Sequence, residues 1–172
     1  QVVVGSGREA QNWRANLDAR ELSGYVDYRQ PQGAGSGRLY ARLARLNIAP
    51  NMTTDVESLL DDQPAGIPAL DIVVEDLELR GRRLGRVEIE ATNRALAGAP
   101  REGGVREWRL TKLNVSVPEA TFTASGNWAA VNAQAAPAAA RGAGEQRRTV
   151  LNFRMDIGNS GELLKRFGMN GV

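Results

Sequence analysis

The stretch Leu70–Ala91 reads LDIVVEDLELRGRRLGRVEIEA, and apolar and polar residues alternate along it with a period of two. Such alternation is typical of β-strands with one apolar and one polar face. The alternation also skips, because Val74 is followed three residues later by Leu77, and Leu84 by Val87. The same skip recurs further along the chain, from Leu110 to Leu113 and from Val117 to Ala120. A jump of three changes the face unless a β-bulge absorbs the extra residue or the strand ends. We therefore expect repeated bulges or turns, which bend and twist a sheet.

The same rhythm extends on both sides of this stretch, up to Ile157. It predicts about eight strands, at residues 13–19, 22–28, 39–48, 69–80, 84–93, 106–117, 119–128 and 149–157. The strands at 69–80 and 84–93 are expected to form a hairpin over a Gly81–Gly85 turn. The predicted fold class is mainly β: a curved, bulged antiparallel sheet, forming an open groove or a partial barrel, with two short helices.

Two segments break the strand rhythm with helical spacing and capping residues. Residues 53–62 (TTDVESLLDD) and 159–167 (NSGELLKRF) each place Thr, Asn or Ser before acidic residues, which favours a helix start. Residues 131–146 are rich in Ala and Gly and are predicted to be a flexible insertion. We expect residues 1–172 to be a single β-rich segment of a larger protein, because the first residue is not Met.

Composition argues against several function classes. The 172 residues contain neither Cys nor His, so thiol chemistry and the commonest general base near neutral pH are missing. The 22 basic and 20 acidic residues are too evenly balanced to favour nucleic-acid binding. The chain has no apolar run of 18 residues, so no membrane-spanning helix is predicted. We expect no enzyme activity, no catalytic residue, no metal site and no cofactor.

Several short motifs resemble catalytic or binding sites but have simpler structural interpretations. The carboxylate pairs Asp61–Asp62 and Glu75–Asp76 could suit a glycosidase, but adjacent acids on one element point apart. Residues 33–37 carry three alternate glycines without the helix that a phosphate loop requires. Trp108 and Trp128 bracket a predicted hairpin, where they could close a core or lie at a lipid boundary.

An ordered set of segments resembles the C-terminal portion of YhdP-type, AsmA-like bacterial envelope proteins. These segments are Ile67–Glu78 (IPALDIVVEDLE), Gly81–Val87 (GRRLGRV), Trp108–Leu113 (WRLTKL), Pro118–Trp128 (PEATFTASGNW) and Asp156–Gly168 (DIGNSGELLKRFG). The resemblance implies a periplasmic region of a protein anchored in the inner membrane through parts absent here. It also implies an apolar β-groove that carries phospholipid between the inner and outer membranes. Residues 1–66 match the family pattern less clearly.

The predicted partners are therefore phospholipid acyl chains, and protein partners stay unknown. The residues expected to face lipid are Leu70, Ile72, Val74, Leu77, Leu79, Val87, Ile89, Leu110, Leu113, Val115, Val117, Phe122, Leu151, Phe153 and Met155. Two alternatives stay open at this point. One is a structural or interaction module in which the apolar face closes on itself as a β-sandwich, and the other is a hydrolase of envelope glycans.

Overall fold

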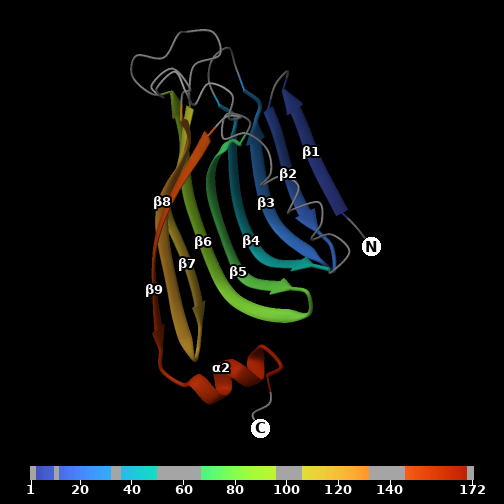
Figure 1. The fold of residues 1–172 in the computed structure, drawn as a ribbon. Coiled ribbons are helices and arrows are strands. Elements are labelled where there is room, and N and C mark those ends of the chain that lie inside the picture. The colour runs from blue at the N-terminus through green and yellow to red at the C-terminus, as the bar shows by residue number, and fades with distance from the viewer. Residues whose placement is uncertain are drawn as a thin grey trace.

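The computed structural model describes residues 3–9, 12–31, 36–49, 67–95, 106–131 and 146–169. Within these ranges the chain forms one nine-stranded sheet, whose strands lie side by side in sequence order, and one helix (Figure 1). The elements are β1 (Val3–Glu9), β2 (Asn12–Asp18), β3 (Leu22–Arg29), β4 (Arg38–Ile48), β5 (Ala69–Leu79), β6 (Arg82–Ala95), β7 (Arg106–Val117), β8 (Ala120–Val131), β9 (Gln146–Ile157) and α2 (Ser160–Arg166).

The mainly β prediction is confirmed, and each of the eight expected strands is present with shifted ends. β1 was not predicted. The helix expected at 159–167 is present as α2, where the backbone N–H of Glu162 donates to Oδ1 of Asn159 over 3.1 Å. The helix expected at 53–62 lies outside the described residues. The insertion expected at 131–146 also lies outside them, apart from its two end residues, which belong to β8 and β9.

The sheet is mixed and mostly antiparallel, so it departs from the predicted antiparallel pairing at one pair of strands. β4 and β5 pair in parallel, with Ala41 opposite Ile72 and Leu43 opposite Val74, whereas every other neighbouring pair is antiparallel. The segment 49–68 connects these two strands. A connection of that length can return to the starting end of the sheet, which a tight hairpin turn cannot do.

The three-residue skips in the apolar pattern correspond to register shifts between paired strands. The register of β5 and β6 shifts between Val74 and Leu77, and that of β7 and β8 shifts between Leu110 and Leu113. The turn between β5 and β6 is tighter than expected. It consists of Arg80 and Gly81, which both have positive φ, as a two-residue hairpin turn of type I′ requires.

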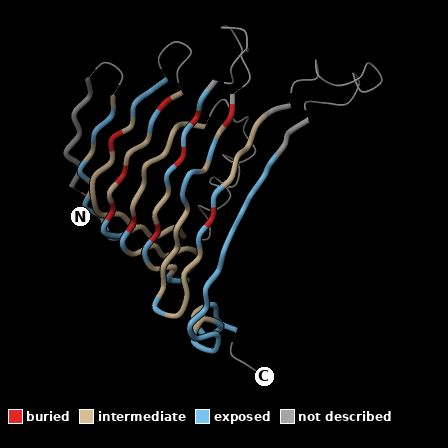
Figure 2. The backbone as a smooth tube through the Cα atoms, turned by 90° about the vertical axis from the view of Figure 1, so that its left-hand side faces the viewer, coloured by how far each residue is buried: buried red, intermediate tan, exposed pale blue. Residues whose placement is uncertain are grey.

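The described strands form a single curved layer with two free edges. β1 and β9 end the strand order and do not pair with each other, so the sheet is not closed into a barrel. Figure 1 shows β3 to β6 bending strongly at their lower ends. Figure 2 shows buried residues only in short stretches of the inner strands, whereas β9 is exposed from residue 149 to 157. Within the described ranges there is no second sheet facing the first, as a β-sandwich would need.

Candidate functional site

The pairing register assembles three rows of apolar residues that cross the sheet from strand to strand. Because directly paired residues share a face, each row lies on one side of the sheet. The first row contains Trp13, Tyr28, Leu39, Leu70, Ala91, Leu110, Gly126 and Leu151. The second row contains Ala15, Val26, Ala41, Ile72, Ile89, Leu113, Ala124 and Phe153. The third row contains Leu17, Gly24, Leu43, Val74, Val87, Val115, Phe122 and Met155.

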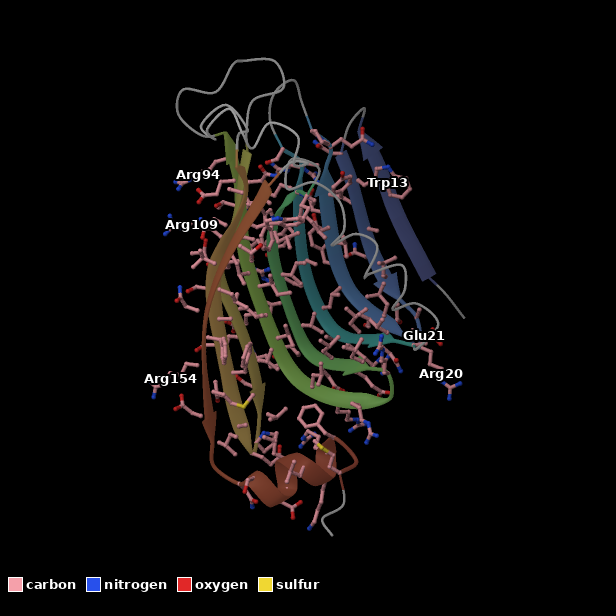
Figure 3. All side chains as sticks on the ribbon, in the orientation of Figure 1. Trp13, Arg20, Glu21, Arg94, Arg109 and Arg154 are labelled. Carbon is pink, nitrogen blue, oxygen red and sulfur yellow. The ribbon has the colours of Figure 1, made fainter. Side chains whose placement is uncertain are left out.

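These rows lie on the inner, concave face of the curved sheet. Arg94, Arg109 and Arg154 point outwards from the side of the sheet that β6 to β9 form (Figure 3). Leu110 follows Arg109 and Phe153 precedes Arg154 in extended strands, so both apolar side chains point to the opposite face. We call the inner face, as lined by the three rows, the apolar groove.

The structure brings all fifteen predicted residues to this face. Twelve of them come from the three rows, and Leu77, Leu79 and Val117 lie lower on the same strands. Their burial changes along the groove: Val74 in a central strand is 2% exposed, whereas Phe153 in the edge strand β9 is 71% exposed. Apolar side chains in the central strands are therefore buried by their neighbours within the sheet, whereas those of β9 are exposed to solvent.

The groove also includes strands for which no lining residue was predicted. Ala41 and Leu43 of β4 form a buried cluster with Val74. The partly buried residues that pack against this cluster are Leu22, Val26, Leu46, Ile72 and Leu77. The two-residue alternation at Leu39, Ala41 and Leu43 also indicates an apolar strand face. These residues were not predicted to line the groove because the family resemblance is weak in this part of the sequence.

The outer face carries ion pairs and hydrogen bonds. Arg42 binds Asp71 over 2.7 Å, and Glu107 accepts from Arg94 over 2.8 Å and from Asn127 over 2.9 Å. The hydrogen bond from Asn127, with those from Arg94, lowers the pKa of Glu107. The hydrogen bond from Lys112 on the neighbouring strand likewise lowers the pKa of Glu88. The sheet thus separates a charged outer face from an inner face whose three rows carry no charged side chain from β2 to β9.

Aromatic residues mark the upper end of the groove. Trp108 and Trp128 are direct partners across β7 and β8, and both are partly buried. The indole Nε1 of Trp108 donates to the carbonyl oxygen of Pro68 over 3.1 Å. This bond ties the start of β5 to β7 across β6, which fits the core-closing interpretation of the pair.

Helix α2 lies below the lower ends of β7 to β9 (Figure 1). Arg166 holds it there through Glu119, which belongs to the turn between β7 and β8. The backbone N–H groups of Gly158 and Asn159 donate to the carbonyl oxygen of the same Glu119. Leu164 and Phe167 leave part of their apolar surface exposed. Because Met155 and Ile157 of β9 are exposed too, the chain end adds apolar surface near the lower end of the sheet.

The carboxylate pairs do not form a facing pair of acids among the described residues. Glu75 is exposed and lies 3.3 Å from Arg86, and Asp76 is its neighbour in the bulge that follows Val74. Asp61 and Asp62 lie outside the described residues. Across the described ranges no cluster of three or more acidic side chains could hold a metal ion. In the same ranges, no helix has the length and apolar character needed to cross a membrane.

Comparison with known proteins identifies the family. The model of the YhdP protein family matches residues 1–172, which is the whole chain. Searches of the curated proteins and of the solved structures gave no match. The match therefore includes all nine strands and the helix described above. The chain belongs to the YhdP family.

Proposed function

We propose that the apolar groove is a conduit for phospholipid acyl chains. The observation that carries this proposal is the run of three apolar rows across eight strands, β2 to β9, on one face of a single-layer sheet. Neighbouring strands lie about 4.8 Å apart, so eight strands span roughly 34 Å from the first to the last. A lipid tail would follow this direction, across the strands rather than along them.

The driving force is removal of hydrocarbon from water. Each methylene of an acyl chain that becomes buried gains about 0.8 kcal/mol. Side chains such as Ile89, Leu113 and Phe122 are only partly buried by the sheet, so part of their apolar surface can cover a tail. The lining consists of aliphatic and aromatic groups without a charged side chain in any of the rows from β2 to β9. A tail would meet similar surroundings at each strand, which favours movement over trapping.

The family membership supports a role in the bacterial cell envelope. We propose that this chain acts in the periplasm, as part of a protein anchored in the inner membrane. In that setting the groove would carry phospholipid between the inner and outer membranes while the charged outer face stays in water. The alternative is a structural envelope module that binds no lipid, and the experiment below separates the two.

Site-specific photocrosslinking tests the proposal with matched neighbours. A photoreactive amino acid is placed at Ile89 or Leu113 on the inner face, and at Glu90 or Asn114 on the outer face of the same strands. After irradiation in cells, we expect phospholipid adducts at Ile89 and Leu113 and none at the two controls. Equal labelling of both faces, or no adduct at either inner position, would mean that the groove does not hold lipid.

A second variant tests whether lipid binding requires an uncharged lining. Ile89→Asp places a carboxylate in the middle row, where an acyl chain would have to desolvate it. We expect lipid adducts at Leu113 to fall strongly in this variant. Glu90→Gln changes the adjacent outer residue and should leave the adducts unchanged. If the purified Ile89→Asp protein keeps its β-sheet circular dichroism and its lipid adducts, the conduit proposal is wrong.

A further inference from the structure

A small cavity lined by tyrosine and charged residues opens on the outer face of β3 and β4, on the side of the sheet opposite the groove. It has a volume of about 250 Å³ and is lined by Tyr25, Asp27, Arg29, Arg38 and Tyr40. Asp27 follows the groove residue Val26 in an extended strand, so its side chain points away from the groove. The cavity and the groove therefore do not share a lining residue.

The cavity carries an excess of positive charge. Arg29 and Arg38 are direct partners across β3 and β4, and their side chains are 57% and 56% exposed. Like charges placed directly opposite each other in a sheet repel. With Arg14 and Arg42, which bind the same two aspartates, the cluster has four arginines against Asp27 and Asp71. Each aspartate is thus shared by two arginines, and these six side chains carry a net charge of +2.

The buried carboxylate of Asp27 holds Arg14 and Arg29 in place. Asp27 is 8% exposed, and its Oδ2 accepts from Nε of Arg14 over 3.3 Å and from the hydroxyl of Tyr25 over 3.4 Å. Its Oδ1 has no hydrogen-bond donor and lies 3.7 Å from Nε of Arg29. Because Arg29 faces Asp27 through Nε, its two Nη groups stay available, and among the described residues none accepts a hydrogen bond from them.

Arg38 is oriented in a similar way, through a single atom. Its Nη2 donates to Oδ2 of Asp71 over 3.3 Å, which leaves Nε and Nη1 for another acceptor. Tyr40 forms one wall of the cavity, held by an edge contact with Tyr25 at 6.2 Å and by the guanidinium of Arg42, 4.2 Å from its ring centre. The Tyr40 hydroxyl can donate a further hydrogen bond.

We propose that this cavity binds a phosphate monoester through Arg29, Arg38 and the hydroxyl of Tyr40. A phosphate monoester carries between about −1.5 and −2 charges near neutral pH, which is opposite in sign and similar in size to the net charge of the four arginines and two aspartates. Guanidinium groups bind phosphate oxygens through two parallel hydrogen bonds, and their free N–H groups here are suited to that geometry. Asp27 and Asp71 act as positioning residues. The inference is independent of the proposed groove function, because the two sites lie on opposite faces.

Isothermal titration calorimetry of the chain with inorganic phosphate, in a phosphate-free buffer of low ionic strength, tests the site. We expect saturable binding that weakens at least tenfold in Arg29→Gln/Arg38→Gln. The matched control is Arg154→Gln, which removes an exposed outer-face arginine on β9 and should bind like the unchanged protein. Arg29→Lys/Arg38→Lys keeps the charge but loses the forked geometry, so its affinity should be intermediate. This variant also guards against misfolding of the glutamine variant.

Two further arms identify the source of the phosphate. Glycerol 3-phosphate represents a free ligand, and vesicles containing phosphatidic acid represent a lipid headgroup. Vesicles with phosphatidylglycerol, which is a phosphodiester, are the comparison. Preference for phosphatidic acid vesicles over both other probes assigns a headgroup, and preference for glycerol 3-phosphate assigns a free ligand.

Absence of saturable phosphate binding overturns the proposal, as does equal binding by the unchanged protein and the double glutamine variant. Lipid adducts at Ile89 should be the same in the double glutamine variant. A failure of the phosphate site can therefore be told apart from a failure of the groove.

Discussion

Arg166 and Glu119 form a two-point ion pair, with Nε 2.9 Å from Oε2 and Nη2 2.7 Å from Oε1. This pair attaches the single described helix to the turn between β7 and β8. The arginine, in turn, lowers the pKa of Glu119 and has its own pKa raised by the carboxylate. The helix is also joined to the sheet by the backbone hydrogen bonds from Gly158 and Asn159 to Glu119, and by one from Nη1 of Arg166 to the carbonyl oxygen of Arg83 over 3.5 Å. The ion pair is the charged part of this attachment.

We predict that Glu119→Gln loosens α2 without unfolding the sheet, because it removes the charge and keeps the shape. Amide hydrogens of Leu163 and Phe167 should exchange faster in a hydrogen-exchange experiment, while those of β5 and β6 stay protected. Glu162→Gln is the control, since the one described ion pair of its carboxylate is with the exposed Lys165 of the same helix. Equal exchange of α2 in both variants would show that the Glu119 pair does not hold the helix.

An apolar residue in a central strand should contribute more to the free energy of unfolding than one in an edge strand. Val74→Ala removes two buried methyl groups, and we expect it to lower the free energy of unfolding by about 2 kcal/mol. Phe153→Ala removes a larger side chain, but its ring is mostly exposed and stacks only on Phe122, so we expect a loss below about 1.5 kcal/mol. Urea unfolding measures both. A larger loss for Phe153→Ala would mean that β9 is covered in solution.

Gly24 is required by a close approach between two strands. A Cβ atom there would lie 2.3 Å from the carbonyl oxygen of Arg42, and the φ of Gly24 is +141°. We expect Gly24→Ala to lower the free energy of unfolding by about 3 kcal/mol, from backbone strain and overpacking together. Gly81→Ala, where a Cβ atom would meet nothing within 4 Å, should cost only about 1 kcal/mol. Similar urea midpoints for the two variants would contradict this account.

Glu107 should contribute to the acid sensitivity of the fold. Its pKa is lowered in the folded state, by the hydrogen bond from Asn127 and by Arg94. The stability it provides is therefore fully present above the unfolded pKa, near 4.3, and is lost as the pH falls through the lower folded value. We expect Glu107→Gln to flatten the loss of stability in this pH range, as measured by thermal unfolding. Glu75→Gln alters an exposed carboxylate and is the control.

Local sequence was sufficient for the strands and for much of the curvature. The skips from Val74 to Leu77 and from Leu110 to Leu113 predicted irregularities that the register shows at those positions. The skip from Val117 to Ala120 corresponds instead to the two-residue turn between β7 and β8. β1 was missed because its segment VVGSGRE contains two glycines and a serine, which have weak strand preference. Its pairing with β2 is a tertiary interaction.

The sequence by itself determined that this protein consists of strands with one apolar and one polar face, because a period of two places successive side chains on opposite sides of a strand. Only the tertiary structure decided that β4 and β5 run in parallel and that Arg29 lies opposite Arg38. It also decided that Val74 is buried while Phe153 is open. These outcomes depend on which strands pair with each other and on which strand forms a free edge of the sheet. The alternation of apolar and polar residues is the same in a central strand and in an edge strand, so it does not specify either outcome.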